Sequence, residues 1–344
     1  GRYAGFMLLG APGADAGSSV TSERVRALRL WNFTRENAEA VRSLASDPSG
    51  DTFGLRWTGS VVAAGSTAEA SMLERQAEVL DDVEWLAPDA LHRRLGDARG
   101  FLGGLLVRTG GVLDPARLVR SLALRSGATV LERSAVGTLE ADGSRVRLTG
   151  ASGALRAERV VLCLGAYLPH LVPGLEAFVR PVRAQMLATE PLAPALYVPV
   201  YSHDGYNNLR QRRDGRVLVG GARHLHEATE VGYDDETTDA LQGHLEAYLG
   251  VHFPGLGTPE VERRWSGTMG FSPDGLPVVG DVPNVPGAHF ATGFTGHGMG
   301  YCLRFGKLLA RRVLGQSDPD ADLFDAARLA PSPHPNGHPS PVTA

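Results

Sequence analysis

Apolar and polar positions alternate along the chain in ways that predict a series of helices and strands. Helical spacing marks residues 22–44, where Thr21 or Ser22 supplies a cap and residues 47–50 end the helix. The apolar positions of this helix are Val25, Leu28, Trp31, Val41 and Leu44. A more polar helix is predicted near residues 68–80 and another over residues 234–250.

Residues 110–148 form a second well-delimited unit. Asp114 is a suitable N-cap, Pro115 suits the first helical position, and Gly127 closes the predicted helix. The residues expected on its buried face are Leu118, Val119, Leu122 and Ala123. A strand is expected at residues 129–131, and then a hairpin of residues 136–140 and 145–148 that turns at Asp142 and Gly143.

Two longer patterns predict sheets of different kinds. Residues 159–166 form a continuous apolar run that ends in glycine, which is typical of a strand buried on both faces of a parallel sheet. Residues 184–222 alternate polar and apolar positions, which predicts antiparallel strands.

A glycine-rich loop stands out near the end of the chain. Residues 293–300, Gly-Phe-Thr-Gly-His-Gly-Met-Gly, lie between an apolar strand at 288–292 and an amphipathic segment at 301–314. The N-terminus of a helix offers free backbone N–H groups and a positive dipole end, which suit an anionic or electron-rich ligand. The alternative is that the glycines relieve crowding at a tight turn. A second motif, Pro-Asp-Gly-x-Pro-x-x-Gly, precedes the loop at residues 273–280.

Together the two motifs resemble the C-terminal flavin-binding signature of the D-amino acid oxidase, glycine oxidase and sarcosine oxidase superfamily of FAD-dependent oxidoreductases. Residues 1–6 resemble a Gly-Arg-Asn-Ala-Gly-Phe segment of that superfamily, with Tyr3 in place of the commoner Asn. There the segment follows a strand–helix–strand unit that carries Gly-x-Gly-x-x-Gly for the pyrophosphate. No such motif follows an apolar strand in this chain, so we expect a family member that lacks this unit.

The resemblance implies an α/β fold class with two discontinuous domains. Residues 1–48, 107–170 and 269–330 would form an incomplete FAD-binding domain, whose parallel sheet lacks its first strands. Residues 49–106 and 171–268 would form a mainly antiparallel α+β substrate domain. The proline-rich residues 331–344 are expected to be a disordered tail.

The resemblance also implies which residues contact a non-covalent FAD, and we expect them to converge on one elongated cleft. In the superfamily a valine at the position of Val136 lies against the adenine, and the strand that ends at Gly165 runs under the flavin. Covalent attachment is not expected, because Gly267 stands where some members carry a cysteine. The expected contacts are Arg2, Ala4, Gly5, Phe6, Val136, Gly165, Ala166, Asp274, Gly275, Pro277, Gly280, Gly293, Gly296, His297, Gly298 and Met299.

On the substrate side, the resemblance points to Tyr206 and Arg210, in a strand–turn–strand that faces the flavin. The Arg210 guanidinium could clamp a carboxylate with two hydrogen bonds, or it could be an exposed arginine on a charged hairpin. Arg183 has structural and functional interpretations of equal weight. His297 either packs beside the cofactor or transfers a proton.

Composition narrows the function class. The 344 residues carry a net charge of −4 with 43% hydrophobic residues, which argues against a nucleic-acid binder. No apolar stretch has the roughly 20 residues of a membrane span, so a cytoplasmic location is the default. Cys163 and Cys302 lie in apolar runs and are expected to be buried thiols. His224 and His226 are interpreted as part of a solvated strand end, and no metal site is predicted.

The reaction that the resemblance implies is oxidation of a C–N bond in a small amine or amino acid, by hydride transfer to flavin. Dioxygen or another acceptor would then reoxidise the flavin. Two alternatives remain at this stage: a flavin dehydrogenase that uses a carrier and not oxygen, and a truncated, non-catalytic remnant of the family.

Overall fold

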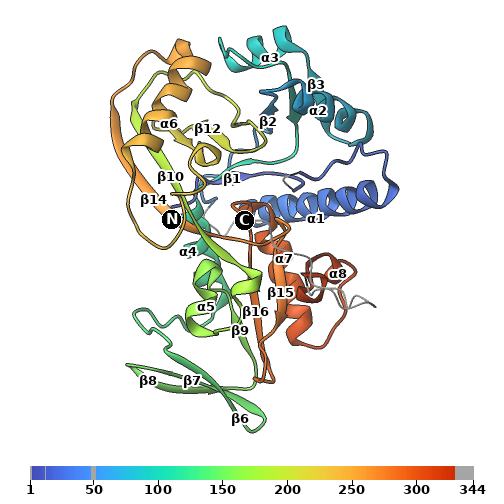
Figure 1. Ribbon diagram of the computed structural model, residues 1–344, viewed down its shortest axis with the longest axis vertical. Coiled ribbons are helices and arrows are strands. Elements are labelled where there is room, and N and C mark those ends of the chain that lie inside the picture. Colours follow the sequence, from blue (N-terminus) through green and yellow to red (C-terminus); the bar gives the residue numbers. More distant parts are fainter. Residues whose placement is uncertain (1, 12, 48–51, 330–344) are drawn as a thin grey trace.

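The computed structural model describes residues 2–11, 13–47 and 52–329. Its largest element is an eight-stranded mixed sheet in the order β14-β10-β13-β12-β11-β2-β4-β3. The strands are β2 (Ser60–Ala63), β3 (Val83–Leu86), β4 (Gly104–Val107), β10 (Arg180–Pro191), β11 (Val200–Ser202), β12 (Asn207–Gln211), β13 (Arg216–Gly220) and β14 (Val261–Phe271). The long strands β10 and β14 run from this sheet towards a smaller one below it (Figure 1).

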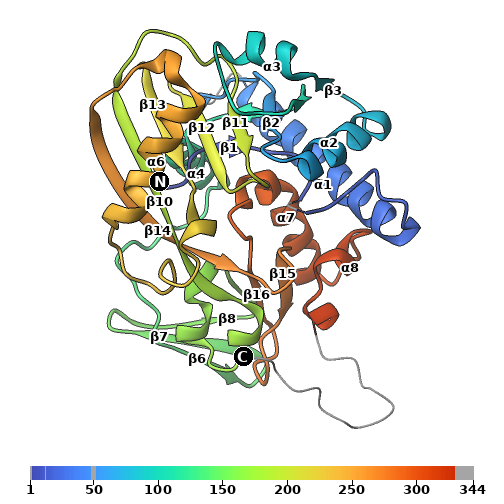
Figure 2. The same ribbon diagram turned by 45° about the horizontal axis from the view of Figure 1, so that its top comes forward.

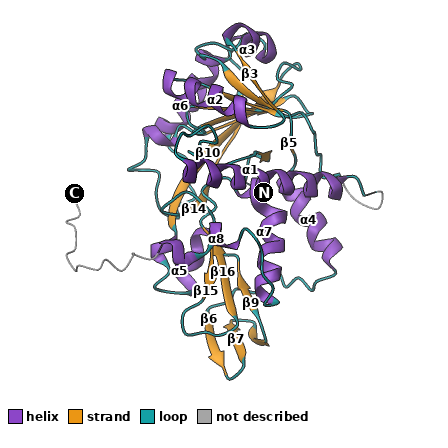
Figure 3. Ribbon diagram, turned by 90° about the vertical axis from the view of Figure 1, so that its right-hand side faces the viewer, coloured by secondary structure: helices purple, strands orange, loops and turns teal. Residues whose placement is uncertain are grey.

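Three smaller sheets complete the β structure. β15 (Val278–Asp281), β16 (Ala288–Thr292) and β9 (Val160–Leu162) form one, in which β16 and β9 are parallel. β6 (Thr138–Asp142), β7 (Arg145–Gly150) and β8 (Gly153–Ala157) form another, which projects from the end of the molecule opposite α3 (Figure 3). β1 (Phe6–Met7) pairs with β5 (Gly111–Val112).

Helices cover these sheets. α6 lies along one face of the eight-stranded sheet and contacts β10 and β13 (Figure 2), while α1 packs on α7. The helices are α1 (Thr21–Ala45), α2 (Thr67–Val79), α3 (Pro88–Leu95), α4 (Pro115–Ser126), α5 (Leu168–Leu171), α6 (Asp239–His252), α7 (Gly298–Val313) and α8 (Ala321–Phe324). Short 3₁₀ turns occur at Gly165–Tyr167, Glu176–Phe178, Arg223–Leu225, Pro254–Leu256 and Ala326–Leu329. Within the described ranges, no helix has the length and apolar character needed to cross a membrane.

Local sequence signals explain α4 well. The Asp114 side chain accepts hydrogen bonds from the backbone N–H groups of Ala116 and Arg117, and Pro115 is the first helical residue. Gly127 ends the helix with φ of 64°, a left-handed conformation that glycine adopts without strain. Leu118 is buried as predicted, but Val119 is exposed, so the predicted buried face was partly wrong.

The α/β fold class is confirmed, but several element predictions were wrong at their margins. α1 begins at Thr21 with Val20 at its N-cap position and no side-chain cap, so neither Thr21 nor Ser22 caps it. α6 begins at Asp239, five residues later than predicted, and β8 extends the predicted hairpin to three strands. Of the helix end predicted at residues 47–50, Asp47 is described and follows the end of α1 at Ala45, whereas residues 48–50 lie outside the described residues, as does the tail at 331–344.

Two strand predictions, at residues 129–131 and 159–166, were wrong in different ways. Residues 129–131 form no strand, and the side chains of Val130 and Leu131 are 61% and 66% exposed. β9 is buried on one face only, since Leu162 is buried while Val161 and Cys163 are exposed. The prediction of a buried Cys163 was therefore wrong. Residues 129–131 have no described strand to pair with. On β9, the side chains of Val161 and Cys163 join none of the core clusters of the described residues, whereas Val160 and Leu162 do.

The sheets also bear on the predicted domains. The eight-stranded sheet takes its strands almost entirely from the two segments assigned to the substrate domain, and β9, β15 and β16 come from those assigned to the FAD-binding domain. β14 crosses the predicted boundary at residue 268. The boundaries themselves stay a prediction.

Candidate active site

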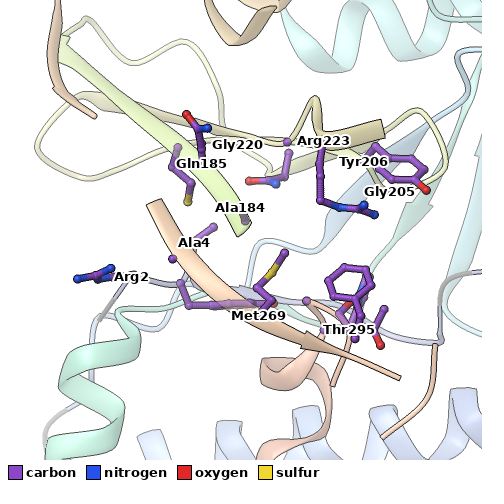
Figure 4. Close-up of a pocket in the computed structure, with 18 of the residues that line it drawn as sticks. Arg2, Ala4, Ala184, Gln185, Gly205, Tyr206, Gly220, Arg223, Met269 and Thr295 are labelled. Carbon is purple, nitrogen blue, oxygen red and sulfur yellow. The ribbon is translucent and has the colours of Figure 1, made fainter. Parts of the chain in front are cut away.

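A cavity of about 360 Å³ lies where four parts of the chain meet. Its walls come from the first residues of the chain, from β10, β12 and β13, from β14, and from the loop that precedes α7. Figure 4 shows Arg2, Ala4 and Met269 on one side of this space, and Tyr206 and Arg223 across from them. This volume falls in the range of small-molecule sites, roughly 300–1,000 Å³.

The N-terminal segment is fixed to β14 by Arg2. The Arg2 guanidinium is paired with the Asp235 carboxylate and donates to the Ser266 carbonyl over 3.1 Å. The Trp265 indole N–H donates to the Arg2 carbonyl over 3.0 Å. These contacts hold Tyr3 and Ala4 in the cavity wall, where the following residues enter β1.

The loop before α7 is fixed to the other end of β14. The Thr295 N–H donates to the Gly270 carbonyl over 2.9 Å, and Phe294 forms a bridge with Phe271. Gly296 has φ of 78° and lines the cavity, where an added Cβ would lie 3.4 Å from the Met269 sulfur. α7 begins two residues later, so the N-terminus of a 16-residue helix stands beside the cavity. The first-turn N–H groups of a helix have no intrahelical acceptor and are available to a ligand.

His297 lines the cavity as a neutral ring. Its Nδ1 lies 3.0 Å from the Thr295 carbonyl oxygen, which can only accept, so Nδ1 carries the proton and Nε2 is the acceptor of the ring. Burial lowers the pKa of His297 below its usual value, because the imidazolium form loses its hydration. The ring is therefore in its basic form at neutral pH.

Arg223 reaches the cavity through a turn that its sequence requires. β13 ends at Gly220, and Gly221 follows with φ of 123°, where an added Cβ would lie 1.9 Å from the Tyr206 carbonyl oxygen. Ala222 is left-handed with φ of 57°, and its N–H donates to the Asn207 side chain over 2.8 Å. The chain then turns into the 3₁₀ segment that begins with Arg223.

Arg223 is buried, at 8% exposure, and its guanidinium lies against aromatic rings. Its Cζ lies 4.8 Å from the centroid of Phe271 and 5.2 Å from that of Tyr206. Within the described residues its side-chain acceptor is the exposed Glu227, at 3.4 Å. A guanidinium has five N–H donors, so most of them remain available to a ligand in the cavity.

The structure places Arg210 elsewhere. It is buried under the N-terminal segment, with Cζ 6.0 Å from the Phe6 centroid, and it does not line the cavity. Burial, together with the charges of neighbouring Arg56 and Arg212, lowers the pKa of Arg210 to about 10. The prediction that Arg210 points into the cleft was wrong, because the residues after Ala4 cover the sheet at that point. Arg183 is structural, in a buried ion pair with Glu230 at 2.8 Å.

The predicted cofactor contacts converge only in part. Five of the predicted site residues line the cavity: Arg2, Ala4, Tyr206, Gly296 and His297. Gly165 and Ala166 do not line it: the Thr292 hydroxyl donates to the Gly165 carbonyl over 2.8 Å, and an added Cβ on Gly270 would lie 3.0 Å from the Ala166 backbone nitrogen. Gly5 and Phe6 continue from the wall into the core, and Gly298 and Met299 open α7.

The remaining predicted contacts do not line the cavity, and their role towards a cofactor stays a prediction. Val136 does not line the cavity and stands, 43% exposed, at the start of the outer β6–β8 sheet. Asp274 pairs with Arg26 and Arg328, next to Gly275 and the buried Pro277. Gly280 and Gly293 give room to neighbours, since an added Cβ would lie 2.8 Å from the Phe290 ring or from the Ser272 Cβ, respectively.

Sequence reasoning missed several residues of the cavity wall. Tyr201, Asn208 and Met269 all line it. Asn208 sits on the same face of β12 as Arg210, so strand alternation pointed to the right face but to the wrong residue. Arg223 carried a usable signal, since Gly-Gly before an arginine marks a sharp turn at a strand end.

Comparison with known proteins identifies the class to which this fold and cavity belong. Residues 3–312 match the family described as FAD dependent oxidoreductase, and the chain belongs to that family. A glycine oxidase of Bacillus licheniformis is 27% identical over 83% of this chain and 78% of the relative. A D-amino acid dehydrogenase of Xylella fastidiosa (strain 9a5c) is 30% identical over 75% of this chain and 61% of the relative.

Solved structures show the same fold. Glycine oxidase from Geobacillus kaustophilus superimposes with a TM-score of 0.77 at 22% identity, over 96% of this chain and 88% of that one. L-proline dehydrogenase from P. horikoshii superimposes with a TM-score of 0.78 at 18% identity, over 94% of this chain and 88% of that one. The resemblance drawn from the motifs is confirmed, and the chain is an FAD-dependent oxidoreductase.

The residues of the cavity fit a flavin. The wall carries bare glycines at Gly267 and Gly296, where a planar ring can approach the backbone. The positive end of α7 suits the electron-rich carbonyl edge of such a ring. The rest of the wall is largely apolar, with Met186 and Met269 among its residues.

Proposed function

We propose that the chain oxidises the C–N bond of a small amino acid or amine that carries a carboxylate. The observation that supports this most directly is Arg223, a buried guanidinium that lines the cavity with most of its donors uncommitted. A planar fork of N–H donors matches a carboxylate with two parallel hydrogen bonds. The glycine oxidase and D-amino acid dehydrogenase names of the relatives agree with such a substrate.

In this proposal one wall of the cavity binds the cofactor and the opposite wall binds the substrate carboxylate. Ala4, Gly296 and the N–H groups that open α7 would hold the non-covalent FAD. When bound, FAD supplies the acceptor for the hydride that leaves the substrate carbon. Arg223 holds the carboxylate across the cavity, and the rings of Tyr206 and Phe271 keep the guanidinium in place.

His297 is the residue suited to receive a proton. Oxidation of an amine to an imine removes a hydride from carbon and a proton from nitrogen. The neutral His297 ring offers Nε2 as an acceptor at the cavity, while the Thr295 carbonyl fixes the opposite nitrogen. His297 thus combines the position and the protonation state that this step needs.

The test is substitution of Arg223 by Met, with Arg212→Met as the control. Arg212 lies in the turn of the β12–β13 hairpin that precedes Arg223, in an exposed pair with Asp214. We expect Arg223→Met to raise the KM for the amino acid about ten- to hundredfold, since a hydrogen bond to a charged group contributes roughly 1.5–3 kcal/mol. Arg212→Met should leave KM unchanged. Equal KM values for the Arg223 variant and the parent would exclude the carboxylate clamp.

The electron acceptor is decided by the product of reoxidation. Release of hydrogen peroxide in air, in step with imine formation, identifies dioxygen. Turnover that requires an added quinone or dye and yields no peroxide identifies a dehydrogenase.

A further inference from the structure

A second cavity of about 300 Å³ adjoins the first. It lies between α1, α2 and the strands β2 and β4, and its walls are mainly hydrocarbon from Ala27, Leu73, Leu105 and Val107. One water needs only about 10–15 Å³ of such space, and an apolar wall offers water few hydrogen bonds. The second cavity therefore suits an apolar ligand far better than water.

The two cavities meet at a neck. Tyr201, Asp204, Gly205 and His297 line both of them. His297, which faces the reacting nitrogen in the proposed function, thus stands at the entrance to the second cavity. A substituent on the substrate that extends past His297 would enter it directly.

The neck is held open by a strained turn and a buried acid. His203 and Asp204 both have φ of 54°, a left-handed conformation that costs free energy for residues other than glycine. The Glu69 carboxylate accepts from the Asp204 N–H over 2.9 Å and from the Gly65 N–H over 2.7 Å. Glu69 is itself buried and lines the second cavity. Two such residues in succession persist only where the surroundings impose them.

A buried donor without a partner also borders this cavity. Trp31 on α1 lines the cavity with 7% of its surface exposed, and its indole Nε1–H has no hydrogen-bond partner among the described residues. The side-chain amide of Gln76, also in the wall, already donates to the Ala14 carbonyl over 3.1 Å. A buried polar group without a partner is costly, and an acceptor on a ligand would satisfy it.

We propose that the substrate carries a large apolar arm that passes the neck beside His297 and fills the second cavity, where an acceptor on the arm pairs with Trp31. The substrate class is then a carboxylate-bearing amine or amino acid with an aromatic or long aliphatic substituent, and not one of glycine size. This inference rests on the proposed function, because it takes the carboxylate and the amine to be held in the first cavity.

The experiment uses unreactive carboxylates as probes: acetate, 4-phenylbutanoate and 4-(4-methoxyphenyl)butanoate. Their dissociation constants are measured by calorimetry on the chain saturated with FAD. We expect 4-phenylbutanoate to bind at least about thirtyfold more tightly than acetate. We expect 4-(4-methoxyphenyl)butanoate to bind severalfold more tightly again, because its methoxy oxygen can accept from Trp31. Trp31→Phe should remove this additional gain and leave the affinity for 4-phenylbutanoate unchanged.

Substitutions that fill the second cavity distinguish binding there from binding in the first cavity. Ala27→Leu should weaken 4-phenylbutanoate about tenfold and leave acetate unchanged. Ala40→Leu, on the same helix but outside the cavity wall, is the matched control and should change neither. Val62→Ile fills the cavity from β2 and replaces Ala27→Leu if that variant does not fold.

The outcomes distinguish the two proposals. Equal affinity for acetate and 4-phenylbutanoate, or equal weakening of both by the filling variants, overturns the second cavity as a substrate site. Arg223→Met should weaken all three probes by a similar factor. If it leaves all three unchanged while the filling variants still discriminate by arm length, the carboxylate clamp fails and the apolar site stands.

Discussion

The eight-stranded sheet and the β15-β16-β9 sheet bury short apolar runs of the chain in different ways. In β10, Leu187 packs in the core under α6, while its neighbours Met186 and Ala188 pack on the opposite face against Phe6. In β9, Leu162 is 5% exposed and its neighbour Val161 is 38% exposed. Each strand contains a short apolar run, but only in β10 are both faces of that run packed, and only β10 has a neighbouring strand on both edges. Apolar character alone therefore does not establish two-sided burial.

The contrast extends to charge. The eight-stranded sheet buries an ion pair between Arg183 and Glu230, whose side chains are almost inaccessible. Burial alone would raise the pKa of Glu230, but hydrogen bonds from Arg183, Gln185 and Thr238 outweigh it and hold that pKa below the usual value. The outer sheet pairs Arg156 with Asp142 at the surface, where solvent screens the interaction.

The largest effect should come from breaking the buried pair. Arg183→Met leaves the Glu230 carboxylate buried without its cation, and we expect the free energy of unfolding to fall by about 3–5 kcal/mol. Arg156→Met, the control on the outer sheet, should cost only about 0–1 kcal/mol. Urea denaturation followed by circular dichroism measures both values. Similar losses for the two variants would contradict the contrast between the regions.

The sign of the pH dependence follows from Glu230. Its folded pKa is lowered, so the pair contributes stability above the unfolded pKa of the carboxyl and loses it as the pH falls through the folded pKa. The difference in stability between the parent and Arg183→Met should therefore shrink in acid. A constant difference across that window would exclude Glu230 as its origin.

A smaller effect should distinguish the two faces of β9. Leu162→Ala removes side-chain atoms from a packed core and should lower the free energy of unfolding by about 2–4 kcal/mol. Val161→Ala on the open face should cost about 0.5 kcal/mol. The same denaturation measurement applies. A loss at Val161 as large as that at Leu162 would show that something covers this face in solution.

Sequence alone reached the parts of the molecule that local chemistry decides. The Asp114 cap, the Gly127 terminus and the hairpin at Gly143 need no distant partner, and each was predicted correctly. Residues 129–131 had a strand-like composition, but a strand also needs a neighbour to bond with, which no local pattern reports.

In the candidate site, too, the part that local sequence specifies was predicted correctly and the part that depends on distant segments was not. The glycine loop at residues 293–300 was placed correctly beside the cavity, because a strand, a glycine turn and a helix specify each other locally. Arg210 was predicted to line the cavity, but Arg223 does. Local sequence does not distinguish the two arginines, because the difference depends on which distant segment covers each of them. Phe6 lies over Arg210, and the strained turn at Gly221 and Ala222 carries Arg223 into the open space.

The last and smallest effect on stability concerns the exposed apolar residues after α4. We expect the double variant Val130→Lys, Leu131→Lys to change the free energy of unfolding by no more than about 0.5 kcal/mol, because both side chains are exposed. Its self-association should nevertheless fall, since exposed apolar residues at an unpaired backbone favour aggregation. Light scattering against protein concentration measures this.

The control for this variant is Val20→Lys, Val25→Lys, which adds the same charge at exposed valines near the start of α1. Both variants move the net charge of −4 closer to zero, a change that by itself promotes association. Loss of the apolar pair should therefore reduce scattering in the first variant, whereas the control should scatter as much as the parent or more. Equal scattering by the two variants would mean that Val130 and Leu131 do not drive association.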